Sequence, residues 1–429
     1  MKTGRKYLIA VLLLVHASCK TSPGPGSPDV FVESFRVNGL SDDRVIQAAL
    51  DAAGEGGCVQ FQPNRVYTIR NVIRVKRFQI LSGYNATLKR ADQTFSQLRI
   101  AAGAGDSALV LDSVPGSWAM GDQLQLLTDS TGAHSNTFGD LPRLPNLVTR
   151  VSGDTVFMSS VAGASVDGSI RQWPAGTTVR KVYTLLRGDS INVHSVPFTV
   201  RDLSFDGNRK NNNLNYYWNV NSTIFTRGAG ALIEHCRFAD ISNENIVGQG
   251  IYITNCQAYH LNGSFVHLSG ADTISLWPQK NSFISGNYIN GVCEVPNSVT
   301  RHSEGAFTSS YNGGFATITG NRVYNCGEAA FGKIEYHIDT ADGGKSDLLI
   351  TNNLFENCRA IVYSISPIPE GGHPSRNIFI ADNIFANCGV NDWSSYRFLP
   401  AYPGLDIGHN SLTDGTTWLL PGQKKVSDR

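Results

Sequence analysis

The pattern Leu232-Ile-Glu-His-Cys-Arg-Phe238 also occurs at Thr199-Val-Arg-Asp-Leu-Ser-Phe205 and at Tyr252-Ile-Thr-Asn-Cys-Gln-Ala258. Four later segments repeat it: Phe283-Ile-Ser-Gly-Asn-Tyr-Ile289, Thr317-Ile-Thr-Gly-Asn-Arg-Val323, Leu349-Ile-Thr-Asn-Asn-Leu-Phe355 and Phe379-Ile-Ala-Asp-Asn-Ile-Phe385. Apolar and polar residues alternate in each copy, which is typical of a short, half-buried β-strand. The copies share a central anchor position, 20 to 34 residues from the next, held by Leu203, Cys236, Cys256, Asn287, Asn321, Asn353 and Asn383. This period predicts a solenoid with one coil per copy, in which the longer intervals carry loops.

The composition supports a single repetitive all-β body rather than two or three separate domains. The 429 residues include 43 Gly and 33 Asn, and 25 of the Asn lie between positions 201 and 400, where they suit tight corners and stacked ladders. Hydrophobic residues make up 41%, enough for a sizeable core, which excludes intrinsic disorder. A net charge of +1 excludes a strongly basic nucleic-acid binder, so we expect no nucleic-acid partner. We also expect the protein to be a monomer.

The segment from Gly39 to Pro63 predicts a helix followed by closely spaced strands. Ser41 can cap the helix, and Asp42 and Asp43 favour the positive end of its dipole. Its apolar stripe comprises Val45, Ile46, Ala49, Leu50 and Ala53. With the following Val66-Tyr-Thr-Ile69, the segment resembles the N-terminal cap of the pectate-lyase-like superfamily. That resemblance implies a right-handed parallel β-helix with an N-terminal capping helix, the fold of polysaccharide lyases, polygalacturonase-type hydrolases, phage tailspikes and alginate epimerases.

The same features divide the chain into six regions. We expect a signal peptide at 1–19, a Pro/Gly/Ser tether at 20–28, the cap and first rungs at 29–101, an insertion with irregular rungs at 102–184, the repeat body at 185–400 and a C-terminal tail at 401–429. Past the N-terminus no run of about 20 apolar residues could span a membrane.

The first 28 residues predict export. Basic residues precede a short apolar stretch from Tyr7 to Val15, as in a secretory signal. Ala17 and Ser18 then precede Cys19, which resembles a bacterial lipoprotein signal, although His16 stands where such signals usually have Leu. We expect lipidation of Cys19 and a place at the outer membrane or cell surface, with the membrane contacted through that lipid alone. The alternative is ordinary cleavage and a periplasmic or secreted protein.

Charged and aromatic side chains concentrate late in this charge-poor chain. The segments Asn262-Gly-Ser-Phe265, Glu304-Gly-Ala-Phe307 and Glu328-Ala-Ala-Phe331 follow successive anchors. If the three Phe side chains stack, His267, Ser309 and Lys333 align on strands about 4.8 Å apart. We therefore predict a catalytic face formed by Lys333, His267, Tyr311, Glu304, Glu335 and His337.

These residue types fit cleavage of a uronic-acid polysaccharide by β-elimination. Such a lyase needs a group that neutralises the uronate carboxylate, a base for the C5 proton and an acid for the leaving oxygen. Lys or His can be the base, Tyr or His the acid, and Arg301 or bound Ca²⁺ the neutralising group. For substrate binding we expect Arg301, His302, Tyr336, Trp218, Trp277 and Arg376, the aromatic rings stacking on sugars.

Two other functions stay open. A glycoside hydrolase would need two carboxylates about 5 Å or 6.5–9.5 Å apart, which Glu304, Glu328, Glu335 and Asp339 could supply. A non-catalytic glycan-binding or structural surface protein could keep the fold without the chemistry. In that case the charges would form a solvated surface ladder.

One rung has a more specific resemblance. Val200-Arg-Asp-Leu-Ser-Phe-Asp-Gly-Asn-Arg209 resembles the rung that opens the alginate C5-epimerase module. That family has an Asp-Pro-His-Glu stretch shortly afterwards, whereas this chain has Asn243-Glu-Asn-Ile-Val-Gly-Gln-Gly250. The departure argues against epimerase activity, and we expect Asp206 and Arg209 to be turn residues.

Apart from Cys19, the cysteines predict buried packing rather than metal ligation or disulfides. Cys326, Cys358 and Cys388 recur five positions after their anchors, and no pair has the Cys-x-x-Cys spacing of zinc sites. We expect an inward column of small apolar side chains. The acidic loop Asp339-Thr-Ala-Asp-Gly-Gly-Lys-Ser-Asp347 could bind Ca²⁺, but it also has the composition of an ordinary polar turn, so Ca²⁺ stays open and the sequence identifies no definite cofactor.

Overall fold

The structure is a computed structural model, and it describes the chain with gaps. The described residues are 29–103, 106–127, 147–159, 172–188, 196–212, 222–226, 230–248, 250–269, 281–294, 305–310, 316–334, 348–365, 378–388, 405–406 and 410–412. At 269, 309–310, 332–334, 360–365, 378, 405–406 and 411–412 the description covers the backbone alone.

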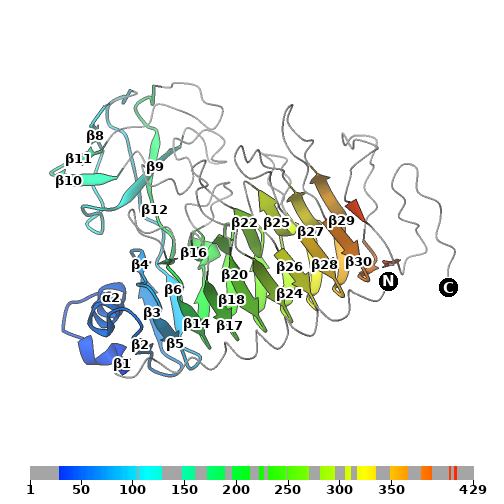
Figure 1. The fold of residues 1–429 in the computed structure, drawn as a ribbon. Coiled ribbons are helices and arrows are strands. Elements are labelled where there is room, and N and C mark those ends of the chain that lie inside the picture. Colours follow the sequence, from blue (N-terminus) through cyan, green and yellow to red (C-terminus); the bar gives the residue numbers. More distant parts are fainter. Residues whose placement is uncertain are drawn as a thin grey trace, which may run out of the picture.

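The chain forms the predicted right-handed parallel β-helix, whose coils contribute strands to three parallel sheets (Figure 1). The first sheet comprises β1 (Asp29–Phe31), β2 (Cys58–Gln60), β5 (Ile80–Ser82), β14 (Thr199–Arg201), β17 (Ala231–Glu234), β20 (Ile251–Thr254), β23 (Ser282–Ser285), β26 (Ala316–Thr319), β28 (Leu348–Thr351), β30 (Ile378–Ala381) and β32 (Leu405–Asp406).

Two strands that continue around a corner join the second and third sheets, namely β27 (Arg322–Ile334) and β29 (Leu354–Ile365). The rest of the second sheet comprises β3 (Val66–Ile69), β6 (Thr87–Arg90), β15 (Ser204–Asp206), β18 (Arg237–Ile241), β21 (Gln257–Leu261), β24 (Tyr288–Val292), β31 (Ile384–Ala386) and β33 (Ser411–Leu412). The rest of the third comprises β4 (Ile73–Arg74), β13 (Leu186–Gly188), β16 (Ile224–Thr226), β19 (Ile246–Gly248), β22 (Val266–Ser269) and β25 (Gly305–Ser310).

The core consists of columns of like side chains, because successive coils pair in register. One column of the first sheet runs from Ile233 through Ile253 and Ile284 to Ile318 and beyond. In the second sheet Phe355 stacks on Phe385 with their ring centroids 5.3 Å apart. Burying each such side chain contributes about 1.5–3 kcal/mol, so the interior of the solenoid holds the coils together.

The predicted helix closes the N-terminal end of this core. It is α2 (Asp42–Ala53), and its apolar stripe is buried as expected, after the short 3₁₀ turn η1 (Val32–Phe35). The Ser41 side chain makes no capping hydrogen bond. Instead, the carboxylate of Asp42 accepts the Thr68 backbone N–H at 2.7 Å, and that of Asp43 accepts the Asn71 side-chain amide at 2.7 Å. The acidic first turn therefore also holds the helix against the first coil.

Two left-handed corners per coil account for much of the Gly and Asn content. The residue before each anchor has a positive φ: Asp202, His235, Asn255, Gly286, Gly320, Asn352 and Asp382. The residue four places after the anchor usually does too: Asp240, His260, Gly291, Asn325, Asn357 and Asn387. Gly, Asn and Asp adopt this conformation at low cost, so the corners select them.

The anchor asparagines form a buried ladder at the corner between the first two sheets. Asn287, Asn321, Asn353 and Asn383 each donate a side-chain hydrogen bond to the next member, over 2.8–3.0 Å, and the ladder ends at Asn410. Each side chain also donates to a main-chain carbonyl, such as that of Ile318. The ladder confirms the prediction that asparagines stack, and it satisfies backbone groups that a bent strand would leave unpaired.

The cysteines pack as predicted in the part of the chain described. All seven described cysteines are buried and free of disulfides: Cys58, Cys236, Cys256, Cys293, Cys326, Cys358 and Cys388. Cys326 and Cys358 face each other on paired strands. Burial raises the pKa of the Cys236 thiol well above its ordinary value. Cys19 lies outside the described residues.

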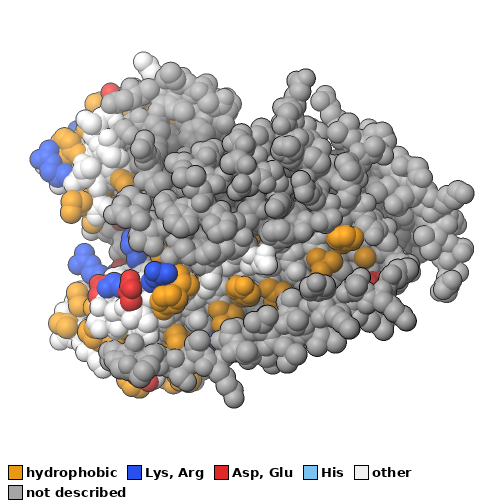
Figure 2. Space-filling model, viewed as in Figure 1, with side chains coloured by type: hydrophobic (Ala, Val, Ile, Leu, Met, Phe, Trp, Pro, Cys, Tyr) orange, Lys and Arg blue, Asp and Glu red, His pale blue; other side chains and the backbone are white. Residues whose placement is uncertain are grey.

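A side insertion leaves the solenoid after β6 and returns before β13. It comprises β7 (Phe95–Gln97), β8 (Ala108–Val110), β9 (Gln123–Leu127), β10 (Val148–Ser152), β11 (Thr155–Met158) and β12 (Thr178–Val182), paired antiparallel in two three-stranded sheets. It has its own core, which includes Trp173 and Leu124. In the face drawn in Figure 2, the coloured Lys and Arg side chains gather over the N-terminal coils and this insertion. Among the described residues, no helix is long and apolar enough to cross a membrane.

Candidate functional site

The structure describes few of the residues predicted for the catalytic face. Of the six, His267 has a described side chain on β22, and Lys333 has a described backbone position on β27. The other four lie outside the described residues: Tyr311, Glu304, Glu335 and His337. So do all the predicted substrate-binding residues, Arg301, His302, Tyr336, Trp218, Trp277 and Arg376. These predictions therefore stay predictions.

The expected alignment of the Phe segments is partly wrong. Phe307 pairs with Phe331 as predicted, but Val266 rather than Phe265 pairs with Phe307. His267 consequently pairs with Thr308, and a register shift within β27 pairs Ser309 with Ile334 rather than with Lys333. The Phe265 and Phe307 rings nevertheless touch edge to face, with centroids 6.3 Å apart. Ring packing tolerates the shift, whereas the backbone ladder decides which side chains lie side by side.

A buried carboxylate–imidazole pair lies on the third sheet. Val266 and Leu268 point into the core, so His267 between them points to the outer face. There His267 Nδ1 is hydrogen-bonded to Oε1 of Glu244, which belongs to the corner between β18 and β19 one coil earlier. The side chains of His267 and Glu244 are 13% and 3% exposed. Sequence reasoning missed Glu244, although its position eight residues after an anchor places it at the corner that precedes the third sheet.

Buried polar atoms without a partner occur at Glu244 and at the next residue in the sequence, Asn245. The second carboxylate oxygen of Glu244 and both side-chain polar atoms of Asn245 are buried without a hydrogen-bond partner among the described residues. Beside them, the hydroxyls of Ser264 and Thr308 bond to each other at 2.8 Å. Because an unsatisfied buried polar atom costs about 1–3 kcal/mol, such atoms gathered around a His–Glu pair suggest a place for polar atoms of a ligand.

The pair can perform acid–base chemistry. Nδ1 of His267 is directed at the Glu244 carboxylate, so Nε2 is the ring nitrogen that does not face Glu244. The carboxylate fixes the orientation of the ring and stabilises the imidazolium that forms when Nε2 accepts a proton. The arrangement therefore supplies a general base that can return its proton as an acid.

Cationic side chains lie along the same outer row. Strand pairing aligns Arg74, Arg187, Phe225, Val247, His267 and Thr308 across the third sheet. The Arg187 guanidinium lies over the Phe225 ring, 4.9 Å from its centroid. Three strand spacings separate Arg187 from His267, about 14 Å. The row thus places the positive charge of Arg187 a few sugar units away from the base His267.

The one carboxylate named for hydrolysis that the structure describes is Glu328. Burial raises the pKa of Glu328, against the opposing charge of Arg359, whose Nη1 lies 3.5 Å from its carboxylate. It lies at the same corner as Glu244 but three coils later, about 14 Å away. That separation exceeds the 6.5–9.5 Å of an inverting pair, so these two glutamates do not form a hydrolase pair.

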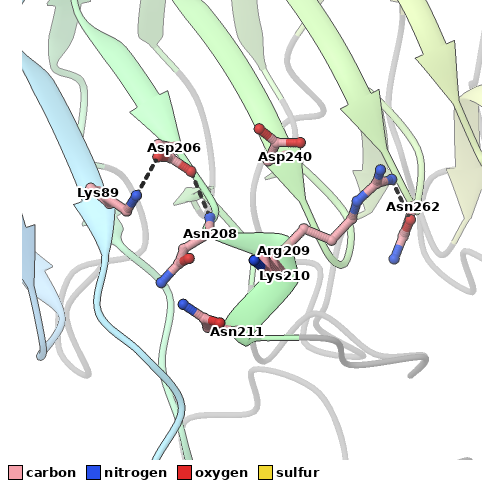
Figure 3. Close-up of a pocket in the computed structure, with 8 residues that line it drawn as sticks. All are labelled: Lys89, Asp206, Asn208, Arg209, Lys210, Asn211, Asp240 and Asn262. Carbon is pink, nitrogen blue, oxygen red and sulfur yellow. Dashed lines mark hydrogen bonds and ion pairs between the residues drawn. The ribbon is translucent and has the colours of Figure 1, made fainter.

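The Asp206–Arg209 turn is confirmed as a turn and also lines a cleft on the second sheet. Asp206 accepts the Asn208 backbone N–H at 2.7 Å, and Asn208 adopts a left-handed conformation before the 3₁₀ turn η2 (Arg209–Asn211). Arg209 donates a hydrogen bond to Asn262 (Figure 3), and it also donates one to Glu294. No group of three metal-ligating side chains occurs in the part of the chain that the structure describes, and the Asp339–Asp347 loop lies outside it.

Comparison with known proteins finds similar solved structures at low sequence identity. No protein-family model matches the chain, and no curated protein sequence matches it. Among solved structures, the A-module of a mannuronan C-5 epimerase from Azotobacter vinelandii is 10% identical with a TM-score of 0.33, covering 90% of this chain and 95% of the module. A Thermotoga maritima exopolygalacturonase is 10% identical with a TM-score of 0.40, covering 92% and 94%. A glycoside hydrolase is 9% identical with a TM-score of 0.29, covering 83% and 88%.

Proposed function

We propose that the protein is a carbohydrate-active β-helix that cleaves a uronic-acid polysaccharide by β-elimination on the outer face of its third sheet. The observation that carries the proposal is the buried His267–Glu244 pair with unpaired polar atoms beside it. The resemblance of the N-terminal cap to polysaccharide-acting β-helix proteins supports the substrate class. The aligned arginines of the same row support an anionic polymer.

In this reaction His267 Nε2 would take the C5 proton of a uronate unit. The C–H electron pair forms the C4–C5 double bond, the C4–O bond breaks, and the leaving oxygen gains a proton. Glu244 would hold the imidazole in place and stabilise its protonated form, acting as a positioning residue. Lys333 and Tyr311 stay candidates for base and acid, and Arg301 for neutralising the uronate carboxylate.

Hydrolysis is the second candidate, and the raised pKa of Glu328 supports it, since a protonated carboxylic acid can serve as general acid. It would need a partner carboxylate such as Glu304 or Glu335. A glycan-binding protein without activity is the third candidate.

We propose further that the protein is exported and held at the bacterial cell envelope by a lipid on Cys19. The short apolar stretch and the following Pro/Gly/Ser tether support this placement. A tether would let the solenoid reach polymer outside the membrane.

The test is incubation of residues 29–429 with polygalacturonate, alginate and neutral galactomannan, following ultraviolet absorbance of unsaturated products and new reducing ends together. We expect both signals on an acidic polymer, and a loss of about 10²–10⁴-fold in rate for His267→Gln. His235→Asn is the control, because His235 is an exposed histidine at a left-handed corner between the first and second sheets, a conformation that Asn adopts at low cost. New reducing ends without ultraviolet absorbance would reject the lyase in favour of the hydrolase, and the absence of both signals would favour binding alone.

A further inference from the structure

A cleft on the outer face of the second sheet has the properties of a saccharide-binding site separate from the His267 face. Its volume is about 630 Å³, and it is lined by Lys89, Asp206, Asn208, Arg209, Lys210, Asn211, Asp240 and Asn262 (Figure 3). These residues come from four successive coils: β6, the turn after β15, and the ends of β18 and β21. We name it the Arg209 cleft. Nothing in the reaction proposed above uses it.

The walls of the Arg209 cleft are held in place without a ligand. Arg209 Nη1 donates to Asn262 Oδ1 at 2.8 Å and to Glu294 Oε2 at 2.7 Å, and the other oxygen of Glu294 lies 2.8 Å from His260 Nδ1. Burial tends to raise the pKa of Glu294, but the hydrogen bonds from Arg209 and His260 outweigh it and lower the pKa. Glu294 therefore stays charged at neutral pH and keeps Arg209 in position.

The other side of the cleft is fixed in the same way. One oxygen of Asp92 accepts the side-chain amides of both Asn208 and Asn211 at 2.8 Å, and these hydrogen bonds lower the pKa of Asp92. A site whose side chains are already ordered loses little conformational entropy when it binds a ligand. The cleft is thus prepared for a ligand rather than collapsed on itself.

Unused donors and acceptors stand side by side in this cleft. Asp240 and Lys210 have no ion-pair partner among the described residues, and the Asn262 amide nitrogen is not used in binding Arg209. Hydroxyl groups both donate and accept, so a ring carrying several of them matches such a mixture. A phosphate would meet two carboxylates, and a metal ion would meet Lys89, Lys210 and Arg209. The lining therefore favours a hydroxyl-rich sugar unit.

A row of tyrosines continues from the cleft along the same face. Asp206 pairs with Ala239, and Ala239 with Tyr259, so Tyr259 lies two strands further on. The ring centroids of Tyr259 and Tyr288 are 5.9 Å apart, and those of Tyr288 and Tyr324 are 5.3 Å apart. All three rings are half-buried, so each keeps part of its surface exposed to solvent. Aromatic rings offer flat apolar surfaces on which sugar rings can pack.

We propose that the Arg209 cleft and the Tyr259–Tyr288–Tyr324 row together form a second, non-catalytic track that binds a polysaccharide chain parallel to the solenoid axis. From β6 to β27 the track spans five strand spacings, about 24 Å. The choice of a saccharide rests on the proposed function. A polymer held on this face would keep further segments near the His267 face at high effective concentration.

The test is affinity electrophoresis of residues 29–429 in gels containing polygalacturonate, alginate or galactomannan. We expect at least one polymer to retard the protein, and the variant Asp240→Asn with Tyr288→Ala to bind about tenfold more weakly. Asn keeps the left-handed corner at position 240, so this variant should fold. Tyr252→Ala is the matched control, because Tyr252 is half-buried on the outer face of the first sheet in the same coil as Tyr259.

The outcomes separate this proposal from the proposed function. His267→Gln should lose cleavage and keep full retardation, whereas the Asp240/Tyr288 variant should lose retardation and still cleave short oligosaccharides. If His267→Gln keeps its activity, the proposed catalytic role of His267 fails. Loss of retardation by the Asp240/Tyr288 variant would still support the track in that case. Equal retardation of the Asp240/Tyr288 variant and the wild type, with unchanged melting temperatures, overturns the track. Retardation of the wild type by none of the three polymers also overturns it.

Discussion

Replacement of Asn353 by alanine tests how much of the solenoid's stability comes from its buried asparagine ladder. Asn353 Oδ1 accepts both the backbone N–H and the side-chain amide of Asn321 at 2.9 Å, and Asn353 Nδ2 donates to Asn383 Oδ1 at 2.9 Å. Alanine removes these contacts at a site that is 2% exposed, where water cannot replace them.

The magnitude follows from counting the groups left without partners. The Asn321 side-chain amide keeps its bond to the Ile284 carbonyl, but the Asn321 backbone N–H loses its acceptor. One buried unsatisfied N–H costs about 1–3 kcal/mol, and the lost bond to Asn383 adds about 1 kcal/mol. We expect Asn353→Ala to lower the free energy of unfolding by about 2–4 kcal/mol. With a urea m-value of about 3 kcal/mol/M, the denaturation midpoint falls by about 1 M.

The assay is equilibrium urea unfolding followed by far-ultraviolet circular dichroism, with Asn290→Ala as control. Asn290 belongs to an exposed ladder, where its Oδ1 accepts the Asn325 side-chain amide at 2.8 Å. Water can replace that bond, so the control should change stability by no more than about 0.5 kcal/mol. Equal midpoint shifts for the two variants would refute the assignment of stability to the buried ladder. Asn353→Asp keeps the acceptor but buries a charge, so it should be less stable than Asn353→Ala at pH 7 and recover as the pH falls.

Three other predictions concern different parts of the molecule. The described cysteines should not react with Ellman's reagent in the native protein and should all react after denaturation, because all seven are buried; fast native labelling would contradict this packing. The Arg209–Glu294 ion pair should persist at pH 5 and be lost as the pH falls further, because the pKa of Glu294 in the folded protein lies below its ordinary value. The pair therefore stabilises the fold above the pKa that Glu294 has in the unfolded chain, and this stabilisation disappears as the pH falls through the folded pKa. An Arg209→Gln variant whose stability differs from that of the wild type equally at pH 3 and pH 6 would refute this. Cys19→Ser should move the protein from the membrane fraction to the soluble exported fraction, and an unchanged membrane fraction would reject the lipid anchor.

The sequence predicted those features that depend on strict repetition. Asn287, Asn321, Asn353 and Asn383 were identifiable as one column because each coil needs the same side chain at the same corner. The capping helix was predictable from Ser41 to Gly54 because its apolar stripe and acidic first turn are local properties. These features require no knowledge of loop lengths, since backbone conformation and neighbouring coils fix them.

Side-chain alignment on the third sheet was less predictable, for a physical reason. His267 and Val247 lie eleven residues after their anchors, so their pairing follows from equal coil lengths. Thr308 lies twenty-one residues after Asn287, and the longer chain between β24 and β25 leaves the register to be set by hydrogen bonding rather than by counting. The prediction aligned phenylalanines by type and was one residue out. Glu244 was not predicted as a site residue, because its segment lacks the family motif and its closeness to His267 becomes visible only in the fold.

The parallel register also explains why two polar surfaces can coexist in a chain so poor in charge. Each outward position of one coil lies about 4.8 Å from its counterpart in the next, so a few side chains of suitable type form a continuous row. On the third sheet Arg187 and His267 lie in one row with the buried Phe225 and Val247 between them, and on the second sheet three tyrosines continue from the Arg209 cleft. The left-handed corner at Asp240 and His260 turns the chain between these sheets. A polymer bound along either row would therefore run parallel to the solenoid axis, so the two faces could bind separate stretches of one chain without any change in the fold.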